Sequence, residues 1–139
     1  MVLHLCLQGI LETMPTAKQV YTFLRECPKQ IGVTPYYQPF MRNYAGGWSG
    51  VQFIAESMVA IHQIDKRCWV DVFSCKEFDI PGAVQFVKES LKLAVVTYKA
   101  LRRDIEGQEH STHNESWSDG TYVITSTTSD LLYEEWIHD

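Results

Sequence analysis

The feature that most constrains this fold is a run of short strand-type segments enclosed by two amphipathic helical segments. The first helix is predicted to begin at Thr16, where Gln19 completes a capping box, and to end at Pro28. The second is predicted over 80–93, opened by Asp79. Extended segments between them are predicted over four ranges: 35–43, 51–55, 58–64 and 68–74.

Two further strands, predicted over 2–7 and 93–101, flank this arrangement. The resulting order is β-α-β-β-β-β-α-β. It predicts an α+β fold, a two-layer sandwich in which a mostly antiparallel sheet carries two helices on one face. The other face of such a sheet also needs cover, which favours a homodimer.

The chain divides into a dense body, residues 1–103, and a polar linker with a C-terminal extension, residues 104–139. A length of 139 residues with 45% hydrophobic residues suits one globular domain. Residues 104–120 are polar and rich in turn formers. Beyond them we expect a short strand over 121–125 and a short amphipathic segment over 131–137.

Composition argues against several partners. The net charge of −5 does not favour binding to a nucleic-acid backbone. No apolar run approaches the ~20 residues of a membrane-spanning helix, so no membrane partner is expected. The N-terminal segment has no basic residues ahead of its apolar run, as a secretory signal would. These features predict a cytoplasmic protein that has neither nucleic acid nor a membrane as its partner.

The cysteines and histidines do not predict a metal site. Cys6, Cys27, Cys68 and Cys75 form no C-x-x-C pair and have few histidines near them in sequence, so we expect reduced thiols. The remaining candidate set lies in the polar linker, where solvated side chains are the better interpretation; it comprises Glu109, His110, His113 and Glu115.

Three residues of the body form a constellation with chemical potential: Ser57, His62 and Cys75. Each taken alone is more often structural than catalytic. Five residues separate Ser57 from His62, so the two side chains face opposite sides of an unbroken strand. If residues 65–67 form the turn of a hairpin, Cys75 falls opposite Ser57 with about 5 Å between Cβ atoms.

The segment from Trp48 to Asp79 resembles the core of the small prokaryotic S-adenosylmethionine decarboxylases, which are self-processing pyruvoyl enzymes. The matching features are Ser-Gly before a strand, Glu56-Ser57 at a strand start, a His five residues after that Ser, and a Val-Asp-Val-Phe-Ser-Cys strand. The resemblance extends over residues 3–103 and identifies them as a decarboxylase-like domain.

This resemblance implies a cofactor made from the chain itself. Cleavage between Glu56 and Ser57 would convert Ser57 into a pyruvoyl group, which binds the substrate amine as an imine and withdraws electrons. His62 matches the acid–base residue of self-processing, and Cys75 matches the proton donor of decarboxylation. No metal or diffusible cofactor is implied. The product would supply the aminopropyl donor for polyamine synthesis.

The aromatic residues Trp48, Phe53 and Trp69 are candidates to stack on adenine or approach the sulfonium, although each also suits a core or dimer interface. Asp65 stands where the family places an acidic ribose ligand. The sequence departs from the family pattern at Gln8, at Met58 and in the turn Gln63–Lys66. Lys66 would repel a sulfonium.

These departures leave two alternatives open. One is a pyruvoyl decarboxylase of another amino acid, arginine or ornithine, with Asp71 and Glu77 as members of an acidic pocket. The other is an unprocessed, non-enzymatic homologue that acts as a binding or regulatory protein.

Overall fold

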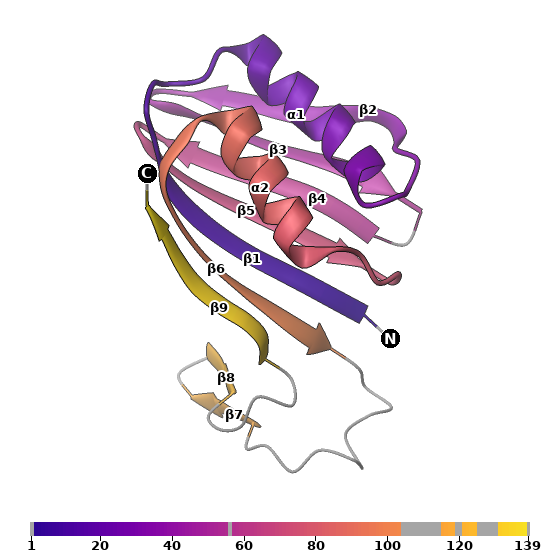
Figure 1. The fold of residues 1–139 in the computed structure, drawn as a ribbon. Coiled ribbons are helices and arrows are strands. Elements are labelled where there is room, and N and C mark those ends of the chain that lie inside the picture. The colour runs from indigo at the N-terminus through magenta and orange to yellow at the C-terminus, as the bar shows by residue number, and fades with distance from the viewer. Residues whose placement is uncertain (1, 56, 104–114, 119–120, 125–130, 139) are drawn as a thin grey trace.

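The computed structural model describes residues 2–55, 57–103, 115–118, 121–124 and 131–138. Its elements in chain order are β1 (Val2–Leu11), α1 (Ala17–Gln30), β2 (Tyr36–Tyr44), β3 (Gly47–Ile54), β4 (Ser57–Ile64), β5 (Arg67–Ser74), α2 (Ile80–Leu91), β6 (Leu93–Arg103), β7 (Glu115–Ser118), β8 (Thr121–Ile124) and β9 (Leu131–His138). Seven strands form one sheet in the order β2-β3-β4-β5-β1-β6-β9. All its neighbouring pairs are antiparallel, and both helices lie on one face (Figure 1). The predicted α+β two-layer sandwich is confirmed.

Helix α1 begins as its sequence predicts. The Thr16 hydroxyl accepts a hydrogen bond from the Gln19 backbone N–H at 3.1 Å, and the Gln19 side chain accepts one from the Thr16 N–H at 2.8 Å. The prediction that Pro28 ends the helix is wrong, because α1 continues to Gln30. Proline has no backbone N–H and its ring crowds the carbonyl four residues earlier, but here only two helical residues follow it. Its carbonyl then accepts the N–H of Ile31 at 3.1 Å.

Helix α2 ends two residues before its predicted limit. Lys92 adopts a left-handed backbone with φ of +56° and turns the chain into β6, so Leu93 opens a strand rather than closing the helix. Asp79 occupies the N-cap position, but its side chain makes no capping hydrogen bond there.

Two-residue turns at 45–46 and 65–66 join β2 to β3 and β4 to β5, and Ile54 of β3 pairs with Ser57 of β4. The predicted three-residue turn over 65–67 is therefore wrong: Ile64 pairs with Arg67, and Met58 pairs with Phe73. Asp65 makes the shorter turn feasible by adopting a φ of +50°. Continued to the start of β4, this register brings Ser74, not Cys75, opposite position 57.

The two faces of the sheet differ in their cover. We call the side under α1 and α2 the covered face and the other side the open face. The covered face holds a core of aliphatic side chains, with Leu5, Val59, Val70 and Val72 fully buried. Side chains on the open face are half-buried or exposed, and they include several aromatic rings: Phe40, Phe53, Trp69 and Phe73.

The C-terminal region contributes strands. Residues 131–138, predicted as an amphipathic segment, form β9 and pair with β6. The predicted strand over 121–125 corresponds to β8, which pairs with β7. His110, His113 and Glu109 lie outside the described residues.

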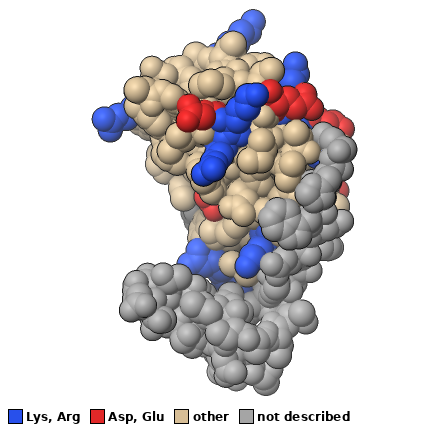
Figure 2. All heavy atoms as spheres, turned by 90° about the vertical axis from the view of Figure 1, so that its left-hand side faces the viewer, with Lys and Arg blue, Asp and Glu red and all other residues tan. Residues whose placement is uncertain are grey.

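Charge on the described surface is mixed. Figure 2 shows Lys and Arg side chains as separate groups on a mostly uncharged surface, some of them beside Asp or Glu. In this view they do not merge into a continuous basic field of the kind that binds a phosphate backbone. Among the described helices, none is long and apolar enough to cross a membrane.

Candidate active site

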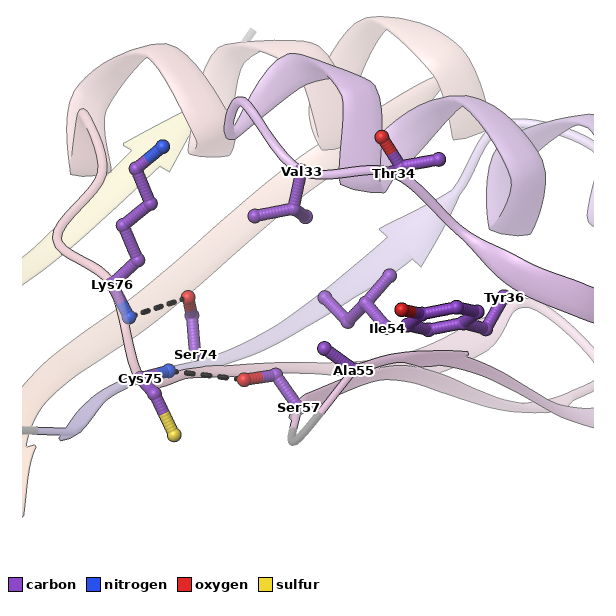
Figure 3. A pocket seen from close by; sticks show the side chains of 9 residues that line it. All are labelled: Val33, Thr34, Tyr36, Ile54, Ala55, Ser57, Ser74, Cys75 and Lys76. Atoms are coloured by element: carbon purple, nitrogen blue, oxygen red, sulfur yellow. Dashed lines mark hydrogen bonds between the residues drawn. The ribbon is translucent and has the colours of Figure 1, made fainter.

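The predicted nucleophile lies at the start of β4. Ser57 is the first residue of the strand, is 9% exposed and faces the covered side. Its Oγ accepts a hydrogen bond from the backbone N–H of Cys75 at 3.0 Å, and the Oγ of Ser74 accepts one from the backbone N–H of Lys76 at 3.0 Å (Figure 3). The first bond fixes the end of β5 against the start of β4, and the second is local to the segment that follows β5.

The turn that precedes Ser57 is strained. Ala55 has a φ of +47°, in the left-handed region that a residue with a Cβ enters at a cost of about 1–2 kcal/mol. Glu56, the other predicted cleavage residue, lies outside the described residues. Cutting the chain at this turn would release the strain at Ala55.

A cavity of about 370 Å³ adjoins Ser57 (Figure 3). This volume lies in the range of small-molecule sites. The lining residues are Val33, Thr34, Tyr36, Ile54, Ala55, Ser57, Ser74, Cys75 and Lys76. The structure therefore places the Ser57 hydroxyl at the wall of a space that can hold a small substrate.

The wall of the cavity has a buried support that sequence reasoning missed. Gln52 is fully buried, and its side-chain amide donates hydrogen bonds to the carbonyls of Tyr36 at 2.7 Å and Tyr37 at 3.2 Å. Tyr37 itself has a φ of +60°, within an irregular stretch of β2. A polar residue at a buried position of the apolar strand β3 was the available signal.

Cys75 approaches Ser57 through its backbone rather than its thiol. The exposed Cys75 side chain points to the opposite side of the backbone from the hydroxyls of Ser57 and Ser74 (Figure 3). The expectation that Cys75 stands directly across from Ser57 is wrong in register, since the turn is one residue shorter. The two residues are nevertheless neighbours.

His62 lies away from this pair. Strand β4 pairs with β3 and β5 without a register shift, so Ser57 and His62 face opposite sides of the sheet. Five residues of extended chain separate them by about 17 Å. The Nδ1 atom of His62 lies 2.5 Å from Ser49 Oγ and 3.3 Å from the Tyr44 hydroxyl, two partners that sequence reasoning did not assign. Ser49 belongs to the Ser-Gly motif, which was the available signal.

The four predicted substrate-binding residues do not converge. Phe53 and Trp69 lie on the open face, where the Trp69 ring is 5.9 Å from that of His62. Trp48 is half-buried and packs against the core. Asp65 lies in the turn at the end of β4 remote from Ser57.

The charged residues that were expected near the substrate also lie elsewhere in the structure. Asp71 pairs with His4 at 2.9 Å and Glu77 pairs with Arg102 at 3.3 Å, and neither carboxylate lines the cavity. Lys66 lies in the turn with Asp65, whereas the cation at the cavity wall is that of Lys76. An acidic pocket built from Asp71 and Glu77 is therefore not present at Ser57.

A sequence model of the family described as S-adenosylmethionine decarboxylase matches residues 6–104. The chain belongs to this family. Among solved structures, the crystal structure of the adenosylmethionine decarboxylase from Aquifex aeolicus VF5 has a similar fold, with a TM-score of 0.62 and 18% sequence identity over 75% of this chain and 91% of that chain. No curated protein sequence matches.

The decarboxylase-family match includes the stretches that carry Ser57, His62 and Cys75. It also extends over β5 and β6 to the end of the predicted body. The family assignment supports a decarboxylase that acts on a small molecule.

Proposed function

We propose that this family member cuts itself between Glu56 and Ser57 and then decarboxylates S-adenosylmethionine, which supplies the aminopropyl donor for polyamine synthesis. The observation that carries the proposal is the Ser57 hydroxyl, held at the cavity wall by the Cys75 N–H at 3.0 Å directly after a strained turn. A serine in the middle of an ordinary strand would have neither the tight turn nor the space.

The cleavage would take place in three steps: an acyl shift, an elimination and a hydrolysis. The Ser57 oxygen attacks the Glu56 carbonyl carbon; the C–N bond breaks as the C–O ester forms, and the hydroxyl proton passes to the amine. Loss of the Ser57 α-proton then breaks the Cβ–O bond, and Glu56 leaves as a carboxylate. The dehydroalanine takes up water and releases ammonia, which leaves a pyruvoyl group at position 57.

The residues around position 57 fit such a group. The pyruvoyl ketone supplies an electron sink for loss of the substrate carboxylate. The backbone N–H of Cys75 keeps this residue beside position 57, and rotation of its exposed side chain would bring the thiol, as a proton donor, to the reacting carbon. The cavity provides space for the substrate, which Cys75 and Lys76 flank.

Arginine and ornithine are less suitable substrates in this arrangement. Both carry a cationic side chain, and the charged group at the cavity wall is the Lys76 ammonium. The carboxylates of Asp71 and Glu77, which were candidates to bind such a cation, engage His4 and Arg102 instead. S-adenosylmethionine also carries a cation, but its nucleoside offers contacts that arginine and ornithine lack.

A homodimer would reconcile the position of His62 with a role in processing. His62 is exposed on the open face, which also presents Phe40, Phe53 and Trp69 with 66%, 46% and 36% exposure. We infer that a second copy covers this apolar face. His62 would then lie at the interface and act on the cleavage turn of the partner, since about 17 Å of extended strand separates it from its own Ser57.

Mixing two inactive variants tests this arrangement. Chains with Ser57→Ala cannot be cut, and chains with His62→Ala lack the acid–base group. When the two are mixed under conditions that exchange subunits, the His62→Ala chain should be cut, since the partner's His62 remains intact. Absence of cutting in the mixture, with cutting retained in re-exchanged wild-type chains, contradicts action across the interface.

Mass spectrometry of the purified chain tests the proposed function as a whole. The expected result is two fragments, 1–56 and 57–139, the second carrying a ketone that borohydride or hydroxylamine modifies. Ser57→Ala should give a single chain with an unchanged circular dichroism spectrum. Release of carbon dioxide from carboxyl-labelled S-adenosylmethionine, compared with labelled arginine and ornithine, then identifies the substrate.

The opposite outcome is equally informative. A single species of 16.0 kDa after prolonged incubation would contradict the enzymatic proposal. The chain would then be an unprocessed homologue that acts by binding.

A further inference from the structure

A cluster of three ligand-type side chains lies on the open face, away from the cavity at Ser57. His4 and Cys6 alternate on β1 and therefore point to the same side of the sheet, and Asp71 of β5 pairs directly with Cys6. The Nε2 atom of His4 lies 2.9 Å from Asp71 Oδ1 and 3.4 Å from Cys6 Sγ. All three ligand atoms lie within 4.8 Å of one another.

We propose that His4, Cys6 and Asp71 form a binding site for Zn²⁺. In tetrahedral zinc sites, bonds of 2.0–2.3 Å place neighbouring ligand atoms about 3.2–3.7 Å apart, so a small outward movement of these side chains admits the ion. A set of one thiol, one imidazole and one carboxylate suits zinc better than magnesium or calcium, which prefer oxygen alone. Three protein ligands leave a fourth position for water or a solute.

The three side chains of the cluster are partly shielded from solvent. The side chains of His4 and Asp71 are 17% and 46% exposed, and Cys6 is half-buried. Burial, together with the nearby Asp71 carboxylate, raises the pKa of the Cys6 thiol to about 11, against the opposing effect of Arg103 and Lys99. The thiol therefore holds its proton in the metal-free protein, and an incoming cation has to displace it.

Arg103 of β6 competes with a metal ion for the imidazole. Its Nη1 lies 3.3 Å from Nδ1 of His4, and its guanidinium stacks over Phe73 at 5.7 Å. When Nδ1 accepts this hydrogen bond, the neutral imidazole carries its proton on Nε2, the nitrogen that faces Cys6 and Asp71. Metal binding at Nε2 therefore requires Arg103 to move, which its exposed position on the strand allows.

The site uses none of the residues placed at Ser57, and its test needs no enzymatic activity, so its failure and that of the proposed function can be told apart. The probe is Co²⁺, whose bond to a thiolate gives a near-ultraviolet charge-transfer band, titrated into the metal-free full chain. We expect a band that saturates at one ion per chain and that added Zn²⁺ abolishes by displacement. Cys6→Ser should remove the band.

Variants make the assignment specific. Cys75→Ser, the matched change at the exposed thiol outside the cluster, should leave the band intact. His4→Ala and Asp71→Asn should each weaken binding by more than about 10-fold, since even outer-shell changes in metal sites cost 10–100-fold. Circular dichroism of each variant verifies that it is folded. A band that persists in Cys6→Ser and disappears in Cys75→Ser overturns the proposal.

A further variant tests the site by a gain rather than a loss of binding. Arg103→Gln should tighten the binding of Co²⁺, because it removes a positive charge beside the ion and frees Nδ1 of His4 to carry the proton. Absence of a band in Arg103→Gln at high Co²⁺ also overturns the proposal.

Discussion

The two faces of the central sheet carry different kinds of side chain, so neighbouring residues of one strand have different roles. On β1, Leu5 is fully buried under the helices, while Cys6 belongs to a half-exposed polar cluster on the open face. On β4, Ile61 is 2% exposed and the adjacent His62 is open to solvent. Because alternate residues of a strand point to opposite sides, one strand can stabilise the fold and carry ionisable groups at the same time.

The largest expected effect is on turnover, and it distinguishes the exposed thiol of Cys75 from a buried one. Cys75→Ala should permit cleavage but reduce turnover by at least about 100-fold, the contribution expected of a general acid. Cys27→Ala, which removes a fully buried thiol of α1, should leave turnover per folded molecule near the parent value. Carbon dioxide release, normalised to the amount of cut chain, measures both. Unchanged turnover in Cys75→Ala contradicts the assigned role.

A matched pair of leucines tests the contrast in stability between the two faces. Leu5→Ala removes a fully buried side chain of the covered face and should lower the free energy of unfolding by about 2–5 kcal/mol. Leu101→Ala, on the open-face side of β6 and only half-buried, should cost less than about 1.5 kcal/mol. Urea denaturation of the two variants gives the comparison. Equal losses would show that the open face is as well covered as the other.

The effect that is smallest near neutral pH comes from Cys27 and grows only under alkaline conditions. Burial raises the pKa of Cys27 to about 12, above its ordinary value of 9.0, so the unfolded chain loses this proton first. The stabilising contribution is complete below about pH 9 and is lost as pH rises towards 12, by about 1.4 kcal/mol per pH unit. Cys27→Ala should therefore show a shallower alkaline decline in unfolding free energy than the parent. An identical slope in both would mean that the thiol is reached by water in the native state.

Local signals in the sequence predicted the elements well. The Thr16–Gln19 capping box fixed the start of α1, and alternation of apolar residues located the strands. Ser57 and Cys75 were brought together as neighbours, although their register was wrong by one residue. Asp65 and Lys66 lack the glycine that usually marks a two-residue turn, so their sequence gave no reason to prefer the shorter loop.

Long-range juxtapositions were beyond local reasoning. His4 and Asp71 are 67 residues apart, and they meet because β1 enters the sheet beside β5. Pairing order depends on the packing of the whole sheet rather than on the sequence of either strand. The support of Tyr36 by the buried Gln52 lies within neighbouring strands, and its signal, a polar residue in an apolar strand, was present but not used.

The strand order has a consequence for a chain nicked between positions 56 and 57. β1, β2 and β3 would belong to the shorter piece and β4, β5 and β6 to the longer one, yet β1 is hydrogen-bonded along both edges to strands of the longer piece. Strands of the two pieces therefore alternate within one sheet. Pulling them apart would require breaking three ladders, β3–β4, β1–β5 and β1–β6, and opening the core, so losing a covalent link would cost the molecule almost none of its architecture.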